Sequence, residues 1–139
     1  MEAQTFVLDI DDTISHIPED QNSEKEISKY PFANPIQPVI DKINLLYERG
    51  HKIILLTARG MRTFNHNVEK VEEFHRPILE KWLSENGVKY HQLVFGKPWG
   101  PNVRYIDDRG LTIDQFVNAD EKSYDNCLTL NKKETYAKL

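Results

Sequence analysis

The 139-residue sequence has a single cysteine, Cys127. One cysteine excludes an intrachain disulfide and a cysteine metal cluster. Long apolar runs are also missing, because no window approaches the roughly 20 residues of a membrane span. The opening residues, Met1 to Thr5, lack the basic segment of a signal peptide. We therefore expect a cytoplasmic protein that makes no use of a membrane.

An excess of basic residues is missing as well. The chain has 18 Lys and Arg against 22 Asp and Glu, for a net charge of −4. This balance excludes a general polyanion binder, so nucleic acid is an unexpected partner. The length suits one compact domain over residues 1–139.

Apolar runs and helical spacings alternate along the chain. Strands are predicted at 5–8, 52–57, 92–95 and 103–106, with a last edge strand at 127–130. The run Ile53–Leu56 is typical of a strand covered on both faces. Helices are predicted at 35–49, capped by Asn34-Pro35, at 67–86 and at 112–118, with a weakly helical tail at 131–139. Pro77 predicts a kink in the second helix, or two abutting helices. The alternation indicates an α/β fold with a mostly parallel sheet.

Polar side chains follow four of the predicted strands. They are Asp9 and Asp11, then Thr57 and Arg59 on either side of Ala58, then Lys97, and finally Asp107 and Asp108. Ligands of parallel α/β sheets bind beyond the carboxyl ends of the strands, so these groups should meet. Two neighbouring carboxylates also call for a cation or a shared proton. Simpler interpretations are an acidic turn at Asp9–Asp12, a helix cap at Thr57 and a surface lysine at Lys97.

These residues resemble the motifs of the haloacid dehalogenase superfamily. Asp9, Asp11 and Thr13 match its Asp-x-Asp-x-Thr motif, and Thr57, Lys97 and the pair Asp107-Asp108 match the other three in order. The stretches 56–63, 96–99 and 105–109 are similar to small phosphatases encoded with capsule and surface-polysaccharide genes. The resemblance implies a Rossmann-like three-layer sandwich. The insert at 15–34, interpreted as a flap or loop, is too short for a large cap domain, so the capless class is expected.

The resemblance also implies a reaction. Asp9 would attack phosphorus to form an aspartyl-phosphate. Asp11 would protonate the leaving oxygen and later activate water, which requires surroundings that keep Asp11 protonated and Asp9 ionised. Lys97 would neutralise charge on Asp9 and the phosphate. The implied cofactor is Mg²⁺, held by Asp9, the Asp11 carbonyl, Asp107 and Asp108.

Substrate contacts are assigned to the segment after the second strand. Thr57 and the amide of Ala58 would hold the phosphoryl oxygens, while Arg59 and Arg62 either grip a substrate anion or are exposed. His66 and Trp99 have no settled role, and Arg109 is expected to pair with a nearby acid. The expected substrate is a phosphorylated sugar or related small metabolite of polysaccharide biosynthesis. The alternatives are a nucleic-acid end phosphatase, a phosphotransferase, or a non-catalytic phosphate-binding module. The missing cap also suggests a homo-oligomer, because the site must exclude water.

Overall fold

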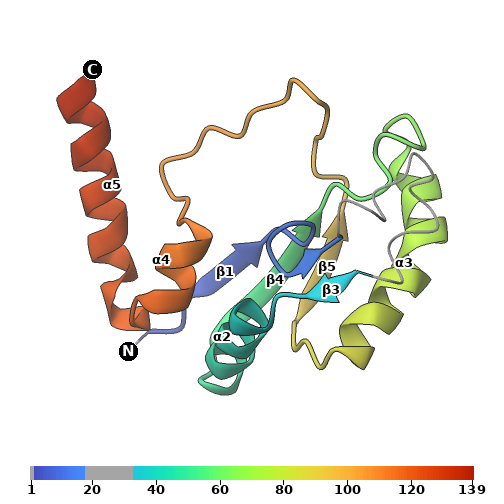
Figure 1. Cartoon of the computed structure of the whole chain (residues 1–139), viewed down its shortest axis with the longest axis horizontal. Coiled ribbons are helices and arrows are strands. Elements are labelled where there is room, and N and C mark those ends of the chain that lie inside the picture. Colours follow the sequence, from blue (N-terminus) through green and yellow to red (C-terminus); the bar gives the residue numbers. More distant parts are fainter. Residues whose placement is uncertain (1, 18–32) are drawn as a thin grey trace. The chain divides into compact units, whose positions relative to one another are not determined.

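The structure is a computed structural model that describes residues 2–17 and 33–139. Its contacts group into two compact units (Figure 1). The N-terminal unit is Glu2–Val103, and the C-terminal unit is Arg104–Leu139. We describe each unit by itself.

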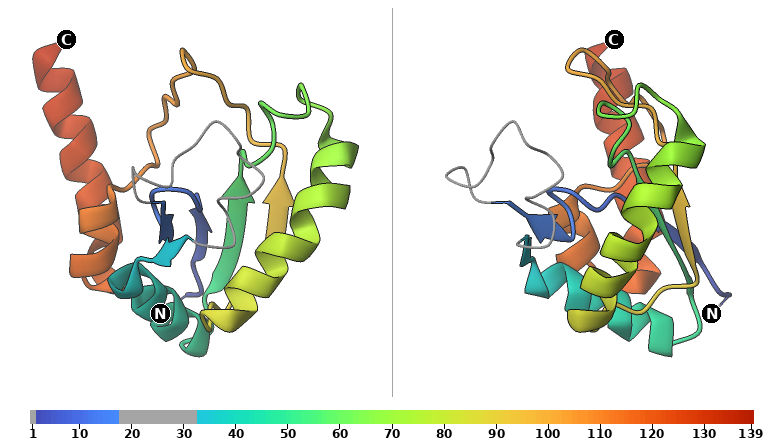
Figure 2. Two further views of the ribbon diagram at one scale, coloured as in Figure 1. Left: turned by 45° about the vertical axis from the view of Figure 1, so that its right-hand side comes forward. Right: turned by 90° about the vertical axis from the view of Figure 1, so that its right-hand side faces the viewer.

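The N-terminal unit is built on three parallel strands, in the order β1 (Thr5–Leu8), β4 (Lys52–Thr57) and β5 (Gln92–Phe95). Helix α2 (Gln37–Glu48) connects β1 to β4, and α3 (Val68–Glu85) connects β4 to β5 (Figure 2). Thr5 is in register with Lys52, and Ile54 with Gln92. The chain is therefore a mixed α/β protein with a small Rossmann-like fold, which confirms the predicted fold class.

The core forms where one face of the strands meets the apolar stripes of the helices. Phe6, Ile53, Leu55 and Leu93 are buried. Ile54 and Leu56 are only half-buried, although the continuous apolar run predicts burial on both faces of β4. The buried helix residues recur at helical spacing; they are Val39, Ile40, Ile43 and Leu46 in α2, and Val71, His75, Leu79, Trp82 and Leu83 in α3.

Two histidines, one directly before β4 and one directly before β5, each accept a backbone hydrogen bond through the ring. The Nδ1 atom of His51 accepts a hydrogen bond from the amide of Gln4 at 2.9 Å. The Nδ1 atom of His91 accepts one from the amide of Ile53 at 3.0 Å. The His91 ring also stacks on Tyr47, with centroids 4.5 Å apart. Each imidazole thus satisfies a backbone donor of the neighbouring strand where the sheet starts.

Helix α2 begins later than predicted. Asn34 and Pro35 form the short strand β3, which pairs antiparallel with β2 (Ser15–His16), so they do not cap the helix. Pro38 takes the place in the first turn that was assigned to Pro35, because a proline there loses no intrahelical hydrogen bond. The ends of the predicted 15–34 insert are thus paired strands, and residues 18–32 lie outside the described residues.

The predicted 67–86 helix is confirmed as the single helix α3. The Asn67 side chain caps it by accepting a hydrogen bond from the amide of Lys70 at 3.3 Å. Pro77 lies inside the helix and is exposed. The two abutting helices offered as one alternative are therefore not formed.

The C-terminal unit consists of α4 (Ile113–Asn118), the 3-10 turn η3 (Glu121–Ser123) and α5 (Tyr124–Lys138). The predicted helix at 112–118 is confirmed, with Thr112 and Gln115 forming a reciprocal capping box. Across residues 2–17 and 33–139, the structure has no helix with the length and apolar content needed to cross a membrane.

Two predicted strands are wrong in this region. Residues 127–130 belong to α5, and the Thr129 hydroxyl donates to the Asp125 carbonyl one turn earlier, so its polar group is satisfied within the helix. Residues 103–106 form no strand either, and Ile106 is 95% exposed. The boundary between the two units falls inside this segment. A four-residue apolar pattern is a weak strand signal because pairing, rather than propensity, decides whether it forms.

Tyr124 ties α5 to α4, which leads to a stability prediction. Its buried hydroxyl donates to the Phe116 carbonyl at 2.7 Å, and burial raises the pKa of Tyr124 to about 12. We expect Tyr124→Phe to lower the free energy of unfolding by about 1 kcal/mol, since the carbonyl loses its partner. Wild-type stability should also fall as the pH rises from about 10 to about 12, because only the unfolded chain then ionises. Urea unfolding at pH 7 and at pH 11 measures both effects. A wild type and variant with identical pH dependence would contradict the assignment.

Candidate active site

The centre of the candidate site is a pair of opposite charges at the carboxyl edge of the sheet. Asp9 directly follows β1, and Lys97 lies two residues beyond β5. The Lys97 Nζ atom is 3.4 Å from Asp9 Oδ1. The Lys97 amide also donates to the Thr57 carbonyl at 3.2 Å, so the lysine loop is fastened to the end of the middle strand. Two residues that are far apart in the sequence are thus brought together as the strand-end argument predicts.

The Asp9 carboxylate is in an unusual electrostatic environment. Burial raises its pKa above the ordinary value, and the attraction of Lys97 opposes this rise only in part. The charge of Asp11 raises the pKa of Asp9 further. A carboxyl group with such a perturbed pKa beside a lysine, at a strand end, is a candidate functional group.

Thr57 ends the middle strand between these two residues. Its side chain is fully buried, and its Oγ1 accepts a hydrogen bond from the Arg59 amide at 3.0 Å. The hydroxyl proton of Thr57 stays available as a donor. Ala58, whose amide was predicted to bind phosphate, is half-buried in the same turn.

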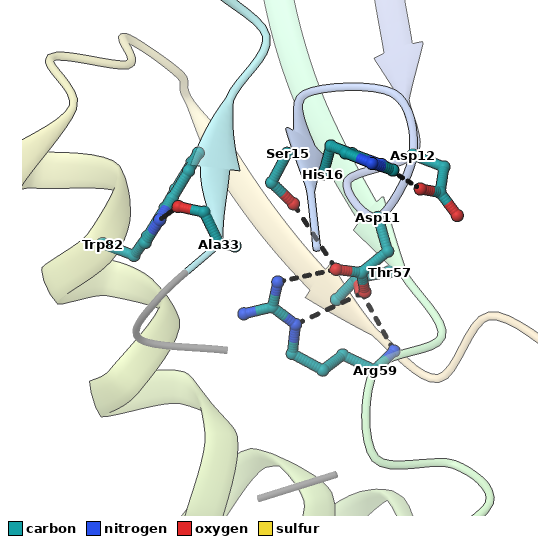
Figure 3. A network of polar contacts seen from close by, with 8 residues as sticks. All are labelled: Asp11, Asp12, Ser15, His16, Ala33, Thr57, Arg59 and Trp82. Atoms are coloured by element: carbon teal, nitrogen blue, oxygen red, sulfur yellow. Dashed lines mark hydrogen bonds and ion pairs between the residues drawn. The ribbon is translucent and has the colours of Figure 1, made fainter. Parts of the chain in front are cut away.

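Arg59 is not the exposed side chain that one of its two predictions describes. Its side chain is only 1% exposed, and it forms an ion pair with Asp11 (Figure 3). Arg59 Nη2 is 2.8 Å from Asp11 Oδ1, and Arg59 Nε is 3.4 Å from Asp11 Oδ2. This pair was not predicted, because nothing in the spacing of the two residues indicates that they touch.

The two acids of the first loop have different neighbours. Asp11 was expected to be kept protonated by its surroundings and Asp9 to be kept ionised. Asp11 contacts the Arg59 guanidinium through both of its carboxylate oxygens. Burial, in contrast, raises the pKa of Asp9.

The loop that carries Asp11 is held by short-range contacts (Figure 3). The Ser15 hydroxyl lies 3.5 Å from Asp11 Oδ1, and the Asp12 amide donates to the Ser15 carbonyl at 2.7 Å. Asp12 has a φ of 64°, a left-handed conformation that Asp tolerates better than most residues. Its side chain points away to an exposed ion pair with His16. Asp12 is thus a turn residue, while Asp11 faces Arg59.

The remaining candidates after β4 and β5 lie at the surface. Arg62 is exposed. His66 Nε2 is 3.2 Å from the carbonyl oxygen of Trp99, which connects the loop after β4 to the loop after β5. Trp99 is 37% exposed.

Asp107 and Asp108 belong to the C-terminal unit. Asp107 Oδ1 accepts a hydrogen bond from the Arg109 amide at 2.9 Å, and Asp108 Oδ2 is 3.5 Å from Lys132 Nζ in α5. Both acids are exposed, and a backbone hydrogen bond and, to a smaller extent, the charge of Lys132 lower the pKa of Asp108. The contact with Lys132 was not predicted, because residues 131–139 were interpreted as a separate weak helix.

The donors of the N-terminal unit fit a hard divalent cation in their chemistry. Asp9 supplies a partly desolvated carboxylate, and Mg²⁺ prefers hard oxygen ligands of this kind. The Asp11 carboxylate is engaged by Arg59, which leaves its backbone carbonyl as the predicted ligand. Within the described part of the chain, no three His, Cys, Asp or Glu side chains group as a ready metal site.

Comparisons with known proteins support the fold. No family model and no curated protein matches the chain. A crystal structure of a structural-genomics target from Vibrio cholerae is similar, with a TM-score of 0.79 and 28% sequence identity. The match covers 92% of this chain and 98% of that one.

Proposed function

We propose that the protein is a Mg²⁺-dependent phosphomonoester hydrolase, a capless member of the haloacid dehalogenase superfamily. The observation that carries the proposal is the contact between Asp9 and Lys97 around the end of β4, where Thr57 lies. A carboxylate, an ammonium group and a hydroxyl at one sheet edge are the groups that a phosphoryl transfer needs for attack, charge neutralisation and orientation. The resemblance of Asp9, Asp11, Thr57 and Lys97 to three of the four superfamily motifs supports the same reaction.

The proposed reaction has two steps. An Asp9 oxygen attacks phosphorus, the bond to the leaving oxygen breaks, and Asp11 gives that oxygen a proton. Water then attacks the aspartyl-phosphate, Asp11 takes a proton from the water, and Asp9 is regenerated as inorganic phosphate leaves. Lys97 stabilises the charge that Asp9 and the phosphoryl group share, and Thr57 and the Ala58 amide orient the phosphoryl oxygens.

The proposed cofactor is Mg²⁺. Asp9 and the Asp11 carbonyl would hold it, and the family resemblance assigns Asp107 and Asp108 as further ligands. Bound Mg²⁺ would reduce the repulsion between the Asp9 carboxylate and the dianionic substrate. The raised pKa of Asp9 is consistent with a carboxylate that gains from a nearby cation.

The proposed substrate is a phosphorylated sugar or related small metabolite of polysaccharide biosynthesis, which rests on family analogy. A nucleic-acid end phosphatase is a second candidate, favoured by the stretch Ile106-Asp107-Asp108-Arg109, although the net charge of −4 argues against it. A phosphotransferase would use the same first step with another acceptor. We also infer a homo-oligomer, since residues 2–17 and 33–139 include no large cap domain, and a fully active monomer in light scattering would contradict this.

A phosphate-release assay tests the proposed function. We expect hydrolysis of phosphorylated sugars in the presence of Mg²⁺, and a loss of at least about 100-fold when EDTA removes the metal, because the cation supplies several kcal/mol of charge stabilisation. Restoring Mg²⁺ should restore the rate. Preference for oligonucleotide ends, with a rate that falls steeply as salt rises, would support the nucleic-acid candidate instead. Tight phosphate binding without turnover would indicate the non-catalytic module.

A further inference from the structure

We propose that Arg59 is a positioning residue for Asp11, and that its guanidinium fixes the carboxylate in the orientation from which Asp11 exchanges a proton with the leaving oxygen. The inference rests on the proposed function and adds a residue that the motif resemblance does not assign. Arg59 does not itself grip substrate in this proposal.

The first support is the geometry of the contact. The guanidinium meets both oxygens of Asp11, through Nη2 at 2.8 Å and through Nε at 3.4 Å. Two contacts from one planar group define the plane of the carboxylate as well as its position, which a single ammonium cannot do. The Ser15 hydroxyl, 3.5 Å from Asp11 Oδ1, lies on the same carboxylate.

The second support is the difference in burial between the partners. The Arg59 side chain is 1% exposed, whereas the Asp11 side chain is 33% exposed. A buried arginine has little freedom to swing toward a substrate, while the half-exposed acid can be reached by one. The exposed member is therefore the group suited to proton transfer, and the buried member is suited to holding it.

The third support is the position of Arg59 in the chain. Its amide donates to the Thr57 hydroxyl at 3.0 Å, while its side chain contacts Asp11. One residue thereby places the predicted phosphate-binding hydroxyl and the predicted proton donor relative to each other. Misplacement of a catalytic group by about 1 Å can lower a rate by roughly 100-fold, so such a bridge would matter to catalysis.

A leaving-group series tests the inference. Phenyl phosphate needs a proton on its leaving oxygen, whereas 2,4-dinitrophenyl phosphate does not. For Arg59→Met, we expect kcat/KM to fall about 100-fold with phenyl phosphate and less than about threefold with the dinitrophenyl ester. Arg59→Lys should fall between wild type and Arg59→Met, and it serves as the test variant if Arg59→Met does not fold by circular dichroism.

A double-mutant cycle separates positioning from a general structural effect. In an Asp11→Asn background, Arg59→Met should change kcat/KM for phenyl phosphate by less than about threefold, because the group that it positions is already absent. Arg76→Met is the matched control. Arg76 pairs with Glu72 at 2.5 Å and Glu80 at 3.2 Å on α3, so the variant breaks arginine–carboxylate pairs outside the site and should show no leaving-group dependence.

Other results would overturn the inference. Equal losses with both esters, or an Arg59→Met effect that adds fully to Asp11→Asn, would mean that Arg59 binds the phosphoryl group or supports the fold, while the proposed function would stand. A wild-type protein without phosphatase activity in Mg²⁺ would instead remove the proposed function, and the role of Arg59 with it.

Discussion

Asp9→Asn should abolish phosphate release, lowering kcat by at least about 10⁴-fold, since loss of a covalent nucleophile has effects of this size. The asparagine keeps the shape of the side chain but cannot form an acyl-phosphate. The fold should persist. Burial raises the pKa of Asp9, so ionisation of this carboxyl costs more in the folded chain than in the unfolded chain. Removing that charge should leave the melting temperature unchanged or higher. Phosphate release and thermal melts of the same preparation measure both effects.

The matched control for this substitution is Asp12→Asn in the same loop. The Asp12 side chain is 82% exposed and pairs only with His16 among the interactions described here, and Asn tolerates the left-handed backbone of this position. We expect its kcat to stay within about twofold of wild type, as for surface substitutions in general. A wild-type rate in Asp9→Asn would refute the assignment of the nucleophile. An equal loss in Asp12→Asn would indicate that the loop, rather than the carboxylate, matters.

Gly60→Ala should destabilise the protein by about 2–5 kcal/mol, the sum of a strained backbone and an overpacked core. Gly60 has a φ of +79°, and a methyl group there would lie 2.5 Å from His75 Cδ2 and 3.3 Å from Val71 Cγ1. His75 is fully buried on α3, so it has little space to move away. Urea unfolding of the wild type and the variant measures the difference in the free energy of unfolding.

Gly50→Ala is the control for backbone strain alone. Gly50 has a φ of +88°, and a methyl group there would meet nothing within 4 Å. We expect a loss of about 1–2 kcal/mol from the left-handed conformation only. Equal effects at the two glycines would contradict the proposed clash with His75. Because Gly60 follows Arg59, Gly60→Ala should also reduce activity if the loop shifts.

The sequence predicts those parts of the fold whose signals are local and long. Helices α2 and α3 and the strands β1, β4 and β5 each carry a clear hydrophobic period or run, and all of them form. The errors fall on four-residue patterns. Residues 127–130 are helical, as are their neighbours on both sides in α5. Residues 103–106 form no strand. Capping by Asn34-Pro35 fails because a strand pairing between β2 and β3 competes for the same residues.

The contacts within the candidate site were likewise predicted only in part. The approach of Lys97 to Asp9 follows from parallel strands ending at one edge, which sequence order and the strand-end rule already imply. The pairing of Arg59 with Asp11 does not follow, because side-chain direction after a strand end depends on the local turn, here one in which Thr57 Oγ1 accepts from the Arg59 amide. The contact of Asp108 with Lys132 depends on how α5 packs within its unit, which no local pattern encodes.

The two histidines at the start of the sheet have a consequence for their own chemistry. Because Nδ1 of His51 and of His91 each accepts a backbone amide proton, the hydrogen of each ring lies on Nε2. A ring with its hydrogen on Nδ1 would direct an N–H at another N–H and break this hydrogen bond. Strand pairing at the amino-terminal end of the sheet, opposite to the edge that carries Asp9 and Lys97, therefore dictates the tautomer of each ring.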